Sequence, residues 1–349
     1  MKLLVIRRDN IGDLLLTTPL LAALRAKLPN ARIDLFTNSY AVPVLRGNPD
    51  VNDVHFYFKA HHRGEDRTRI GVFWDRARLL RQLRRTDYDA ILLAKPKLEK
   101  RPLWLARMIG AREVVGIVEP GQVAPPSVTH VLEWTPAVGG HVVERCFQIA
   151  RHFGIEDRPG PLRLFPDAAA VAKARERLAP AFGRGSPLVA VNLSARKLTQ
   201  RWPATRFVEL VRRLHERHGY AFMLVWSPGS ESNPMHPGDD EKAAQVAAGL
   251  AGIPVVPLAT AELHELVAGL SLASAMITAD GGALHLGAAA GLPILALFGN
   301  SEVARWYPWG VPYEVLQPPS LTVEDISVAD ALAAWERLVE RVRLRPAAA

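Results

Sequence analysis

Short apolar runs of strand length alternate with segments of helical periodicity along most of this chain. In the first half the apolar runs cover residues 3–6, 33–36, 54–57, 90–93 and 114–117, and a helical pattern covers 73–83. In the second half, strand-like runs at 188–192, 221–226, 253–256 and 293–298 alternate with helical patterns at 207–214 and 241–250. This alternation predicts an α/β fold built on doubly wound parallel sheets.

A chain of 349 residues is too long for one ordinary hydrophobic core. The turn-forming residues Arg158-Pro159-Gly160-Pro161 and the pair Pro166-Asp167 mark a linker near the middle. We therefore expect domains at residues 1–165 and 166–320, followed by a C-terminal helical segment at 321–349. The final helix has one apolar face, formed by Leu332, Trp335, Leu338, Val339 and Val342.

The excess of positive charge is confined to the first half. Residues 1–160 hold 25 Lys and Arg against 17 Asp and Glu, whereas residues 161–349 hold 18 of each. An anionic partner, such as a phosphorylated glycolipid or a membrane surface, is expected there, and a solvated basic face is the alternative. Basic and aromatic residues do not alternate as in single-strand binders, so no nucleic-acid partner is expected. The candidate acceptor cations are Arg7, Arg63, Arg67, Arg69, Lys95 and Lys97.

Several protein classes are excluded by missing motifs. The chain has one cysteine, Cys146, which rules out an internal disulfide and a multi-cysteine zinc site. His61-His62 lacks matching ligand spacing, so we expect no metal. Neither G-x-G-x-x-G nor G-x-x-x-x-G-K-[ST] occurs, which disfavours a dehydrogenase-type dinucleotide domain and a P-loop enzyme. The chain has no signal-peptide pattern and no apolar run of about 18 residues, so we expect a cytoplasmic protein.

The loop after the first strand carries the first candidate site. It begins at Arg7 and reaches Asp13, where a helical pattern starts. Ligands of open α/β sheets collect at the carboxyl ends of strands, so Asp13 lies where chemistry is usually placed. The alternative is that Asp13 only caps the helix.

A second candidate site is the sequence Asp280-Gly281-Gly282-Ala283-Leu284-His285. A strand ends here, two glycines allow close backbone approach, and a helix begins with free N–H groups. Together these features predict an anion site suited to a nucleotide diphosphate. The alternatives are a tight turn without ligand and, for His285, simple core packing.

The pattern Arg-x-Asp-x-Ile-Gly-Asp-x-x-x-Thr-x-Pro, residues 7–19, resembles the opening signature of glycosyltransferase family nine, the ADP-heptose:lipopolysaccharide heptosyltransferases. Residues 280–289 resemble the family's Asp-Thr-Gly-x-x-His-Leu-Ala-Ala-Ala segment, with Gly281 replacing Thr. Residues 200–203 resemble its Lys-x-Trp-Pro segment, with Gln200 replacing Lys. His141 opens a His-x-x-Glu-Arg segment that also resembles the family, and interdomain packing is its alternative role.

The resemblance implies a GT-B architecture of two Rossmann-like domains that face each other across a cleft, with the last helix packing back toward the first domain. It implies that Asp13 is the catalytic base of an inverting transfer of heptose from ADP-heptose to a lipopolysaccharide inner-core acceptor. The donor would be bound by Gln200, Asp280, Gly281, Gly282 and His285, with Arg196, Lys197 or Arg201 replacing the missing lysine charge. A carboxylate within residues 238–241 would bind ribose, although Asp239 also fits a helix N-cap.

The implied transfer needs no metal and no cofactor, because the nucleotide sugar is a substrate. Peripheral contact with the cytoplasmic face of the inner membrane is a further expectation. Two alternatives remain at this stage. One is a transferase or epimerase of the same fold that uses another nucleotide sugar, and the other is a nucleotide-binding module without turnover.

Overall fold

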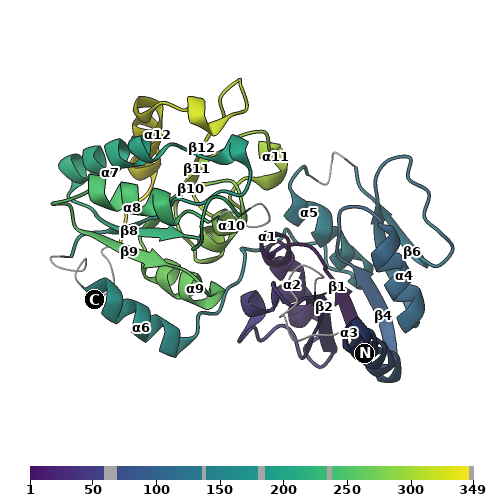
Figure 1. Cartoon of the computed structure of the whole chain (residues 1–349). Helices are drawn as coiled ribbons and strands as arrows, with labels where there is room; N and C mark the ends of the chain where they lie inside the picture. Colours follow the sequence, from purple (N-terminus) through teal and green to yellow (C-terminus); the bar gives the residue numbers. More distant parts are fainter. Residues whose placement is uncertain (59–68, 136–138, 180–184, 234–237, 346–349) are drawn as a thin grey trace. The chain divides into compact units, whose positions relative to one another are not determined.

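The computed structural model describes residues 1–58, 69–135, 139–179, 185–233 and 238–345. The chain forms two compact units, Met1–Phe165 and Pro166–Ala349. Each unit contains one parallel six-stranded sheet with helices packed around it (Figure 1). The predicted α/β class with two doubly wound sheets is therefore confirmed.

The sheet of the first unit has the strand order β3-β2-β1-β4-β5-β6. The five predicted strands are present, each within a few residues of its expected bounds. The sixth, β6, was not predicted because it is a four-residue edge strand whose residues are all half-buried or exposed. The strands are β1 (Lys2–Ile6), β2 (Arg32–Asn38), β3 (Val54–Tyr57), β4 (Tyr88–Leu93), β5 (Ala111–Val118) and β6 (His130–Glu133).

Most helices of the first unit lie between successive strands, and the last two helical segments follow β6. The segment that follows His141 is an α-helix that continues as a 3-10 helix. The elements are α1 (Ile11–Leu15), α2 (Thr18–Lys27), η1 (Val42–Leu45), α3 (Arg69–Thr86), α4 (Lys100–Ile109), α5 (Val142–Phe147) and η4 (Gln148–Phe153).

The sheet of the second unit has the order β12-β11-β10-β7-β8-β9. The strand expected at 253–256 begins two residues later, because the N–H of Ile253 still bonds Leu250 O at the end of a helix. The short strand β12 was not predicted, and all four of its residues are only partly buried. The strands are β7 (Leu188–Asn192), β8 (Ala221–Trp226), β9 (Val255–Ala259), β10 (Ala275–Ala279), β11 (Ile294–Leu297) and β12 (Tyr313–Leu316).

The helices of the second unit cover both faces of its sheet (Figure 1). They are α6 (Ala168–Leu178), η6 (Leu198–Gln200), α7 (Ala204–His218), α8 (Asp240–Gly249), α9 (Leu263–Leu272), α10 (Gly282–Ala289), α11 (Val303–Trp306), η7 (Val323–Asp325) and α12 (Val328–Arg341). None of the helices in the described part of the chain is both long and apolar enough to cross a bilayer.

Both sheets have the same winding order. The first three strands run from the centre of the sheet to one edge, and the last three run from the centre to the other edge. In each sheet the two central strands, β1 and β4 or β7 and β10, meet at the point where the order reverses. Ligands of open α/β sheets bind outside the carboxyl ends of the strands at this point. A ligand site is therefore expected at the loops that follow β1, β4, β7 and β10.

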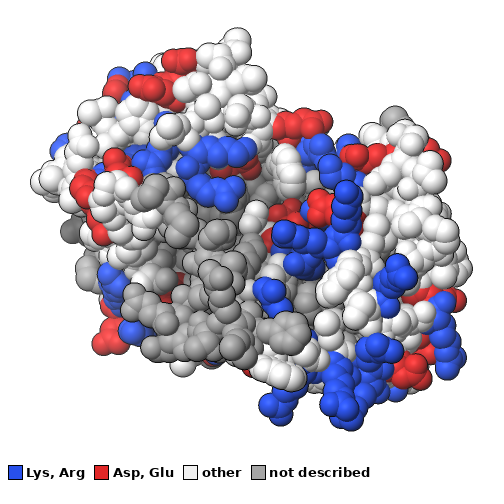
Figure 2. Space-filling view, turned by 45° about the vertical axis from the view of Figure 1, so that its right-hand side comes forward, with Lys and Arg blue, Asp and Glu red and all other residues white. Residues whose placement is uncertain are grey.

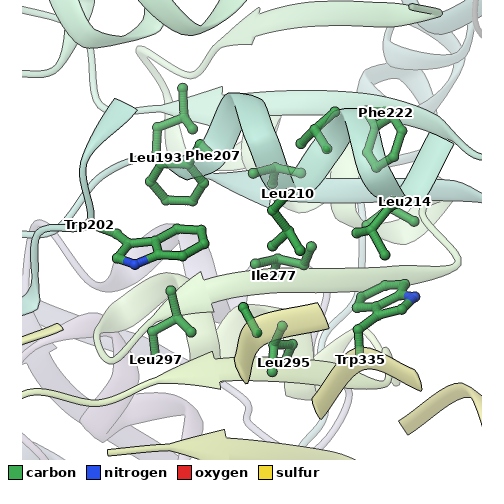
Figure 3. Close-up of a cluster of buried hydrophobic side chains, with 14 of the residues drawn as sticks. Leu193, Trp202, Phe207, Leu210, Leu214, Phe222, Ile277, Leu295, Leu297 and Trp335 are labelled. Atoms are coloured by element: carbon green, nitrogen blue, oxygen red, sulfur yellow. The ribbon is translucent and has the colours of Figure 1, made fainter. Parts of the chain in front are cut away.

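The apolar face of α12 lies in the core of the second unit. Trp335 and Leu332 are buried there, together with residues of α7 and of the central strands, and Figure 3 shows Trp335 beside them. α12 contacts α7, β11 and β12. The expectation that this helix also packs back toward the first unit stays a prediction.

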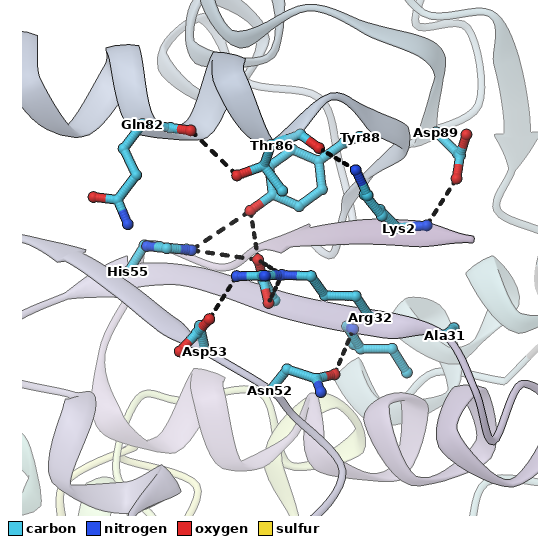
Figure 4. A network of polar contacts seen from close by, with 12 residues as sticks. Lys2, Ala31, Arg32, Asn52, Asp53, His55, Gln82, Thr86, Tyr88 and Asp89 are labelled. Atoms are coloured by element: carbon cyan, nitrogen blue, oxygen red, sulfur yellow. Dashed lines mark hydrogen bonds and ion pairs between the residues drawn. The ribbon is translucent and has the colours of Figure 1, made fainter.

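A buried polar network lies on β2, β3 and β4 of the first unit. The carboxylate of Asp34, which has no exposed surface, accepts hydrogen bonds from Tyr88 (2.6 Å) and Arg32 (2.9 Å) and lies 3.4 Å from His55 Nε2 (Figure 4). Burial opposes the charged form, but the bonds from His55, Tyr88 and Arg32 outweigh it and lower the pKa of Asp34. The network ties β3 and β2 to β4, which lies on the other side of β1, near the amino ends of these strands.

Candidate active site

Arg7 is the first residue after β1, and its side chain is buried. Its guanidinium Nη2 donates to Asp13 Oδ1 at 2.7 Å, and Nε lies 3.3 Å from Asp9 Oδ2. Nη1 donates to the carbonyl of Ala94, the first residue after β4, and lies 3.4 Å from the sulfur of Cys146. A single arginine thus connects the two central strand ends with the acidic loop between β1 and α1.

Asp13 is the third residue of α1, and its side chain is 17% exposed. The helix N-cap is Asn10, whose backbone N–H donates to Asp13 Oδ2 at 3.2 Å. One carboxylate oxygen therefore stabilises the start of the helix, as in a capping box, and the other meets Arg7. Asp13 is not the N-cap itself, and both of its oxygens are held in place while part of the side chain faces solvent.

The burial of Arg7 changes the role that we assign to it. Desolvation alone would lower its pKa, but the neighbouring Cys146, Asp13 and Asp9 together raise it. Burial also raises the pKa of the Cys146 thiol. Since only 2% of Arg7 is exposed, we reassign it from acceptor binding to the positioning of Asp13.

The other expected acceptor cations differ in their surroundings. Lys95, in the loop after β4, pairs with Asp9 (2.9 Å) and Glu99 (2.6 Å), whereas Lys97 is exposed. Figure 2 shows Lys and Arg side chains in several groups with carboxylates between them. Arg69 begins α3, and Arg63 and Arg67 lie outside the described residues. Acceptor binding by these cations stays a prediction.

In the second unit, the ends of β7 and β10 and the loop after β11 are joined by side-chain amides. Gln200 Nε2 donates to Asp280 Oδ2 at 2.7 Å and to Ser301 Oγ at 2.9 Å. Asn192 Nδ2 donates to Thr278 Oγ1 at 3.0 Å. Gln200 is buried, so the residue at the family's lysine position holds two loops together at the carboxyl edge of the sheet.

The predicted glycine turn follows β10. Gly281 is the N-cap of α10, and Gly281 and Gly282 are both exposed. The first turn of a helix leaves backbone N–H groups without helical partners, so this end of α10 offers donors to an anion. At Gly287 a Cβ would lie only 2.5 Å from Met276 Sδ, which shows that α10 packs closely on β10.

The three cations of the loop after β7 differ in exposure and in the contacts they make. Arg196 and Lys197 are exposed. Arg201 Nε donates to Ala195 O at 3.1 Å, and its Nη2 lies 3.8 Å from Asp239 Oδ1. Arg196 and Lys197 are therefore the cations of this loop that can move most easily to meet a diphosphate.

Three residues singled out from the sequence are buried in packing positions. His285 is 4% exposed and lies beside Trp306, with ring centroids 6.2 Å apart, which favours the packing alternative. His141 is fully buried and caps α5 by accepting the N–H of Val143 at 3.1 Å. Trp202 donates to Ile326 O at 3.0 Å and packs against the start of α7. Asp239 is the N-cap residue of α8, although its side chain makes no capping bond.

Ser301 and Asn192 were not identified from the sequence. Both lie at or just after strand ends, Asn192 as the last residue of β7 and Ser301 in the loop after β11. Their positions at strand ends were the only signal in the sequence. The hydrogen bond from Gln200 to Ser301 could not be predicted, because the two residues lie 101 positions apart in the chain.

The model of a protein family described as glycosyltransferase family 9 (heptosyltransferase) matches residues 76–324, which is more than half of the chain. The chain belongs to glycosyltransferase family 9. A lipopolysaccharide heptosyltransferase 3 of Escherichia coli is 27% identical over 306 residues, which cover 85% of this chain and 83% of that protein.

Two solved structures show the same fold over nearly the whole chain. A glycosyltransferase of family 9 from Veillonella parvula superposes with a TM-score of 0.79 at 20% identity, covering 98% of this chain and 97% of that one. The E. coli ADP-heptose lps heptosyltransferase II gives 0.73 at 22% identity, covering 98% and 99%. The fold of two Rossmann-like domains expected from the sequence is therefore confirmed, and the protein is a glycosyltransferase.

The family match begins at residue 76, so it does not include Asp13. The roles of Asp13 and of the donor cations depend on the geometry described above.

Proposed function

We propose that this family 9 enzyme transfers heptose from ADP-heptose to the inner core of lipopolysaccharide, with inversion at the anomeric carbon. The names of the E. coli relatives, a lipopolysaccharide heptosyltransferase 3 and an ADP-heptose lps heptosyltransferase II, support this choice of donor and acceptor. The basic first half of the chain is suited to a phosphorylated acceptor. Such an acceptor would be met at the cytoplasmic face of the inner membrane.

The observation that carries the proposal is the fixed carboxylate of Asp13. It lies at the switch point of the first sheet, part of it faces solvent, and Arg7 and the Asn10 N–H fix both of its oxygens. A general base must be held in one orientation to accept a proton at the moment of attack. A carboxylate that only capped α1 would not need a buried arginine.

The proposed reaction runs as a single displacement at the anomeric carbon. The acceptor hydroxyl attacks the anomeric carbon while Asp13 takes its proton, so one C–O bond forms. The bond between the anomeric carbon and the diphosphate breaks on the opposite face, and ADP leaves with the electron pair. Attack from the face opposite the leaving group inverts the anomeric configuration. General-base catalysis contributes typically about 10²–10⁴ in rate.

The leaving diphosphate gains negative charge as the glycosidic bond breaks, and the second unit would stabilise this charge. The N–H groups at the start of α10 are fixed donors, and Gly281 leaves room for close approach. Lys197, Arg196 or Arg201 would supply the positive charge that the family's lysine provides. Gln200 keeps its amide on Asp280 and Ser301 and so shapes the loop. We expect the transfer to need no metal ion.

The experiment that tests the proposal is calorimetry with ADP, UDP and GDP and their sugars, followed by a transfer assay with heptose-deficient lipopolysaccharide. We expect ADP and ADP-heptose to bind more tightly than the other nucleotides, and heptose to appear on the acceptor. Preference for UDP or GDP would contradict the donor assignment. Binding of ADP-heptose without any transfer would contradict the proposed reaction.

A further inference from the structure

Glu113, His130 and His152 come together on the first unit, away from the carboxyl ends of its strands. The ligand atoms of the three side chains lie within 4.8 Å of one another. Within the described residues, this trio is the one group of three or more such side chains close enough to share a metal ion. Two imidazoles and one carboxylate form a ligand set that zinc enzymes use.

Three different elements supply these side chains. Glu113 is the third residue of β5, His130 is the first residue of β6, and His152 lies near the end of η4. β5 and β6 are parallel neighbours in which Val115 is paired with His130, and η4 contacts β5. The trio thus lies near the amino ends of two strands, at the edge of the sheet opposite to Asp13.

The orientation of His152 is set by a direct contact with the carboxylate. His152 Nε2 lies 2.9 Å from Glu113 Oε2, and the rings of His130 and His152 are 4.3 Å apart between centroids. The His152 side chain is 17% exposed and that of Glu113 is 44% exposed. An ion could therefore enter from solvent, and an ordinary ion pair between His152 and Glu113 would not explain why a second imidazole stands beside it.

The other imidazole is oriented by Thr129. The Thr129 hydroxyl accepts the N–H of Val114 at 2.9 Å, lies 3.3 Å from Val114 O, and is 3.0 Å from His130 Nδ1. If the hydroxyl donates to Val114 O, it can accept from Nδ1–H of His130. That tautomer leaves Nε2 unprotonated, and metal-binding histidines are commonly held by such a hydrogen bond from the other ring nitrogen.

We propose that Glu113, His130 and His152 form a zinc-type divalent metal site. Zinc binds histidine nitrogens and carboxylate oxygens at about 2.0–2.2 Å, so small side-chain rotations would bring the three ligand atoms onto one ion. Three protein ligands leave the fourth position for water. The site is separate from the transfer chemistry. It would fasten the short edge strand β6 and η4 to β5, and its effect would be on stability.

The test uses the untagged full-length protein, stripped of metal and then dialysed against Zn²⁺ at equilibrium. We expect one zinc per chain with micromolar or tighter affinity, a higher melting temperature with zinc, and no comparable effect of Mg²⁺. His130→Ala, His152→Ala and Glu113→Gln should each weaken zinc binding at least about tenfold, which is the loss typical even for residues that only support metal ligands. Each variant should keep its far-ultraviolet circular dichroism spectrum.

Two control variants separate this site from other histidines. His218 pairs with Glu336 at 3.1 Å without a second imidazole in that pair, so His218→Ala should leave zinc binding unchanged. The double variant His61→Ala/His62→Ala should also retain it. Absence of zinc binding to the wild-type protein would overturn the proposal. Zinc binding that persists in His130→Ala and His152→Ala, or that is lost in the His61/His62 variant, would equally overturn it.

Discussion

Arg7 organises the loop after β1 because one buried side chain meets four different groups. It binds Asp13, Asp9, the carbonyl of Ala94 and the sulfur of Cys146. A buried charge is stable only when it is paired and hydrogen-bonded, and the two carboxylates provide that pairing. The hydrogen bond from Arg7 also holds Asp13 in one place. The proposed base is therefore positioned by the same contact that balances the buried charge of Arg7.

The charge of Lys197 can be tested against that of its neighbours. We expect Lys197→Ala to weaken ADP binding roughly 10- to 100-fold, because a charge-assisted contact to phosphate is worth about 1.5–3 kcal/mol. Gln200→Lys should tighten ADP binding or leave it unchanged. Calorimetry with ADP measures both, and exposed Lys173 on α6 gives the control variant Lys173→Ala. Unchanged affinity in Lys197→Ala would assign the role to Arg196 or Arg201.

The buried network of Asp34 gives a prediction about pH. We expect Tyr88→Phe to lower the free energy of unfolding by about 1–3 kcal/mol at pH 7, because it removes the 2.6 Å bond to a buried carboxylate. The lowered pKa of Asp34 stabilises the fold above the unfolded-state pKa near 3.9, and this stabilisation is lost as pH falls through the folded-state pKa.

Removing the Tyr88 bond raises the folded-state pKa of Asp34. The difference in stability between wild type and Tyr88→Phe should therefore shrink below about pH 4. Urea unfolding at several pH values measures this, with the exposed Tyr40→Phe as control. A difference that stays constant down to pH 2 would show that Asp34 is not the group involved.

Among the elements, α12 shows how much one helix contributes to the second unit. Trp335 is fully buried, whereas Trp104 on α4 is 56% exposed. We expect Trp335→Ala to lower the free energy of unfolding of the second unit by about 3–5 kcal/mol, since it leaves a cavity in a packed core. Trp104→Ala should change stability by about 0.5 kcal/mol or less. Urea unfolding of both variants measures this, and a loss of under about 1 kcal/mol in Trp335→Ala would mean that α12 is not part of this core.

The sequence predicted those strands whose residues form apolar runs, including the partly buried edge strands β3 and β9. The central strands were found because they are continuous apolar runs, and the glycine turn after β10 was found because a strand end, two glycines and a helix start are adjacent in sequence. The edge strands β6 and β12 were missed because each has only four residues, one of which is a glutamate. These short strands are defined by their partners more than by their own residues.

The contacts that give the site its geometry join residues far apart in the chain. Arg7 meets Ala94 and Cys146, and Gln200 meets Asp280 and Ser301. No local pattern indicates that Arg7 is buried, so its assignment to the acceptor was reasonable from charge alone and had to be revised. The motif positions could be predicted from the sequence, but the orientations of their side chains depend on the winding of the two sheets.

At the scale of the whole molecule, the excess positive charge lies entirely within residues 1–160. If the acceptor meets that half and the donor diphosphate is held by backbone donors in the second unit, their salt sensitivities should differ. Exposed charges are screened beyond about 8 Å at physiological ionic strength. We expect added salt to raise the KM of a phosphorylated acceptor several-fold more than that of ADP-heptose.

Steady-state kinetics at low and high salt measures this difference. Replacing Arg63, Arg67 and Arg69 with Glu should reproduce the effect of salt on the acceptor at low salt. The matched control is the charge reversal of Lys173, Arg343 and Arg345 in the second unit, which should leave the acceptor KM unchanged. Equal salt dependence for both substrates would mean that the basic half is only a solvated surface.

The catalytic role of Asp13 is tested most directly by the variant Asp13→Asn in a single-turnover transfer assay with ADP-heptose. Asparagine keeps the size of the side chain, and Asp9 remains beside Arg7 to balance its charge. We predict that transfer falls at least about 100-fold, the loss expected when a general base is removed, while ADP binding and melting temperature stay nearly unchanged. Transfer within about tenfold of wild type would contradict the assignment of Asp13 as the base.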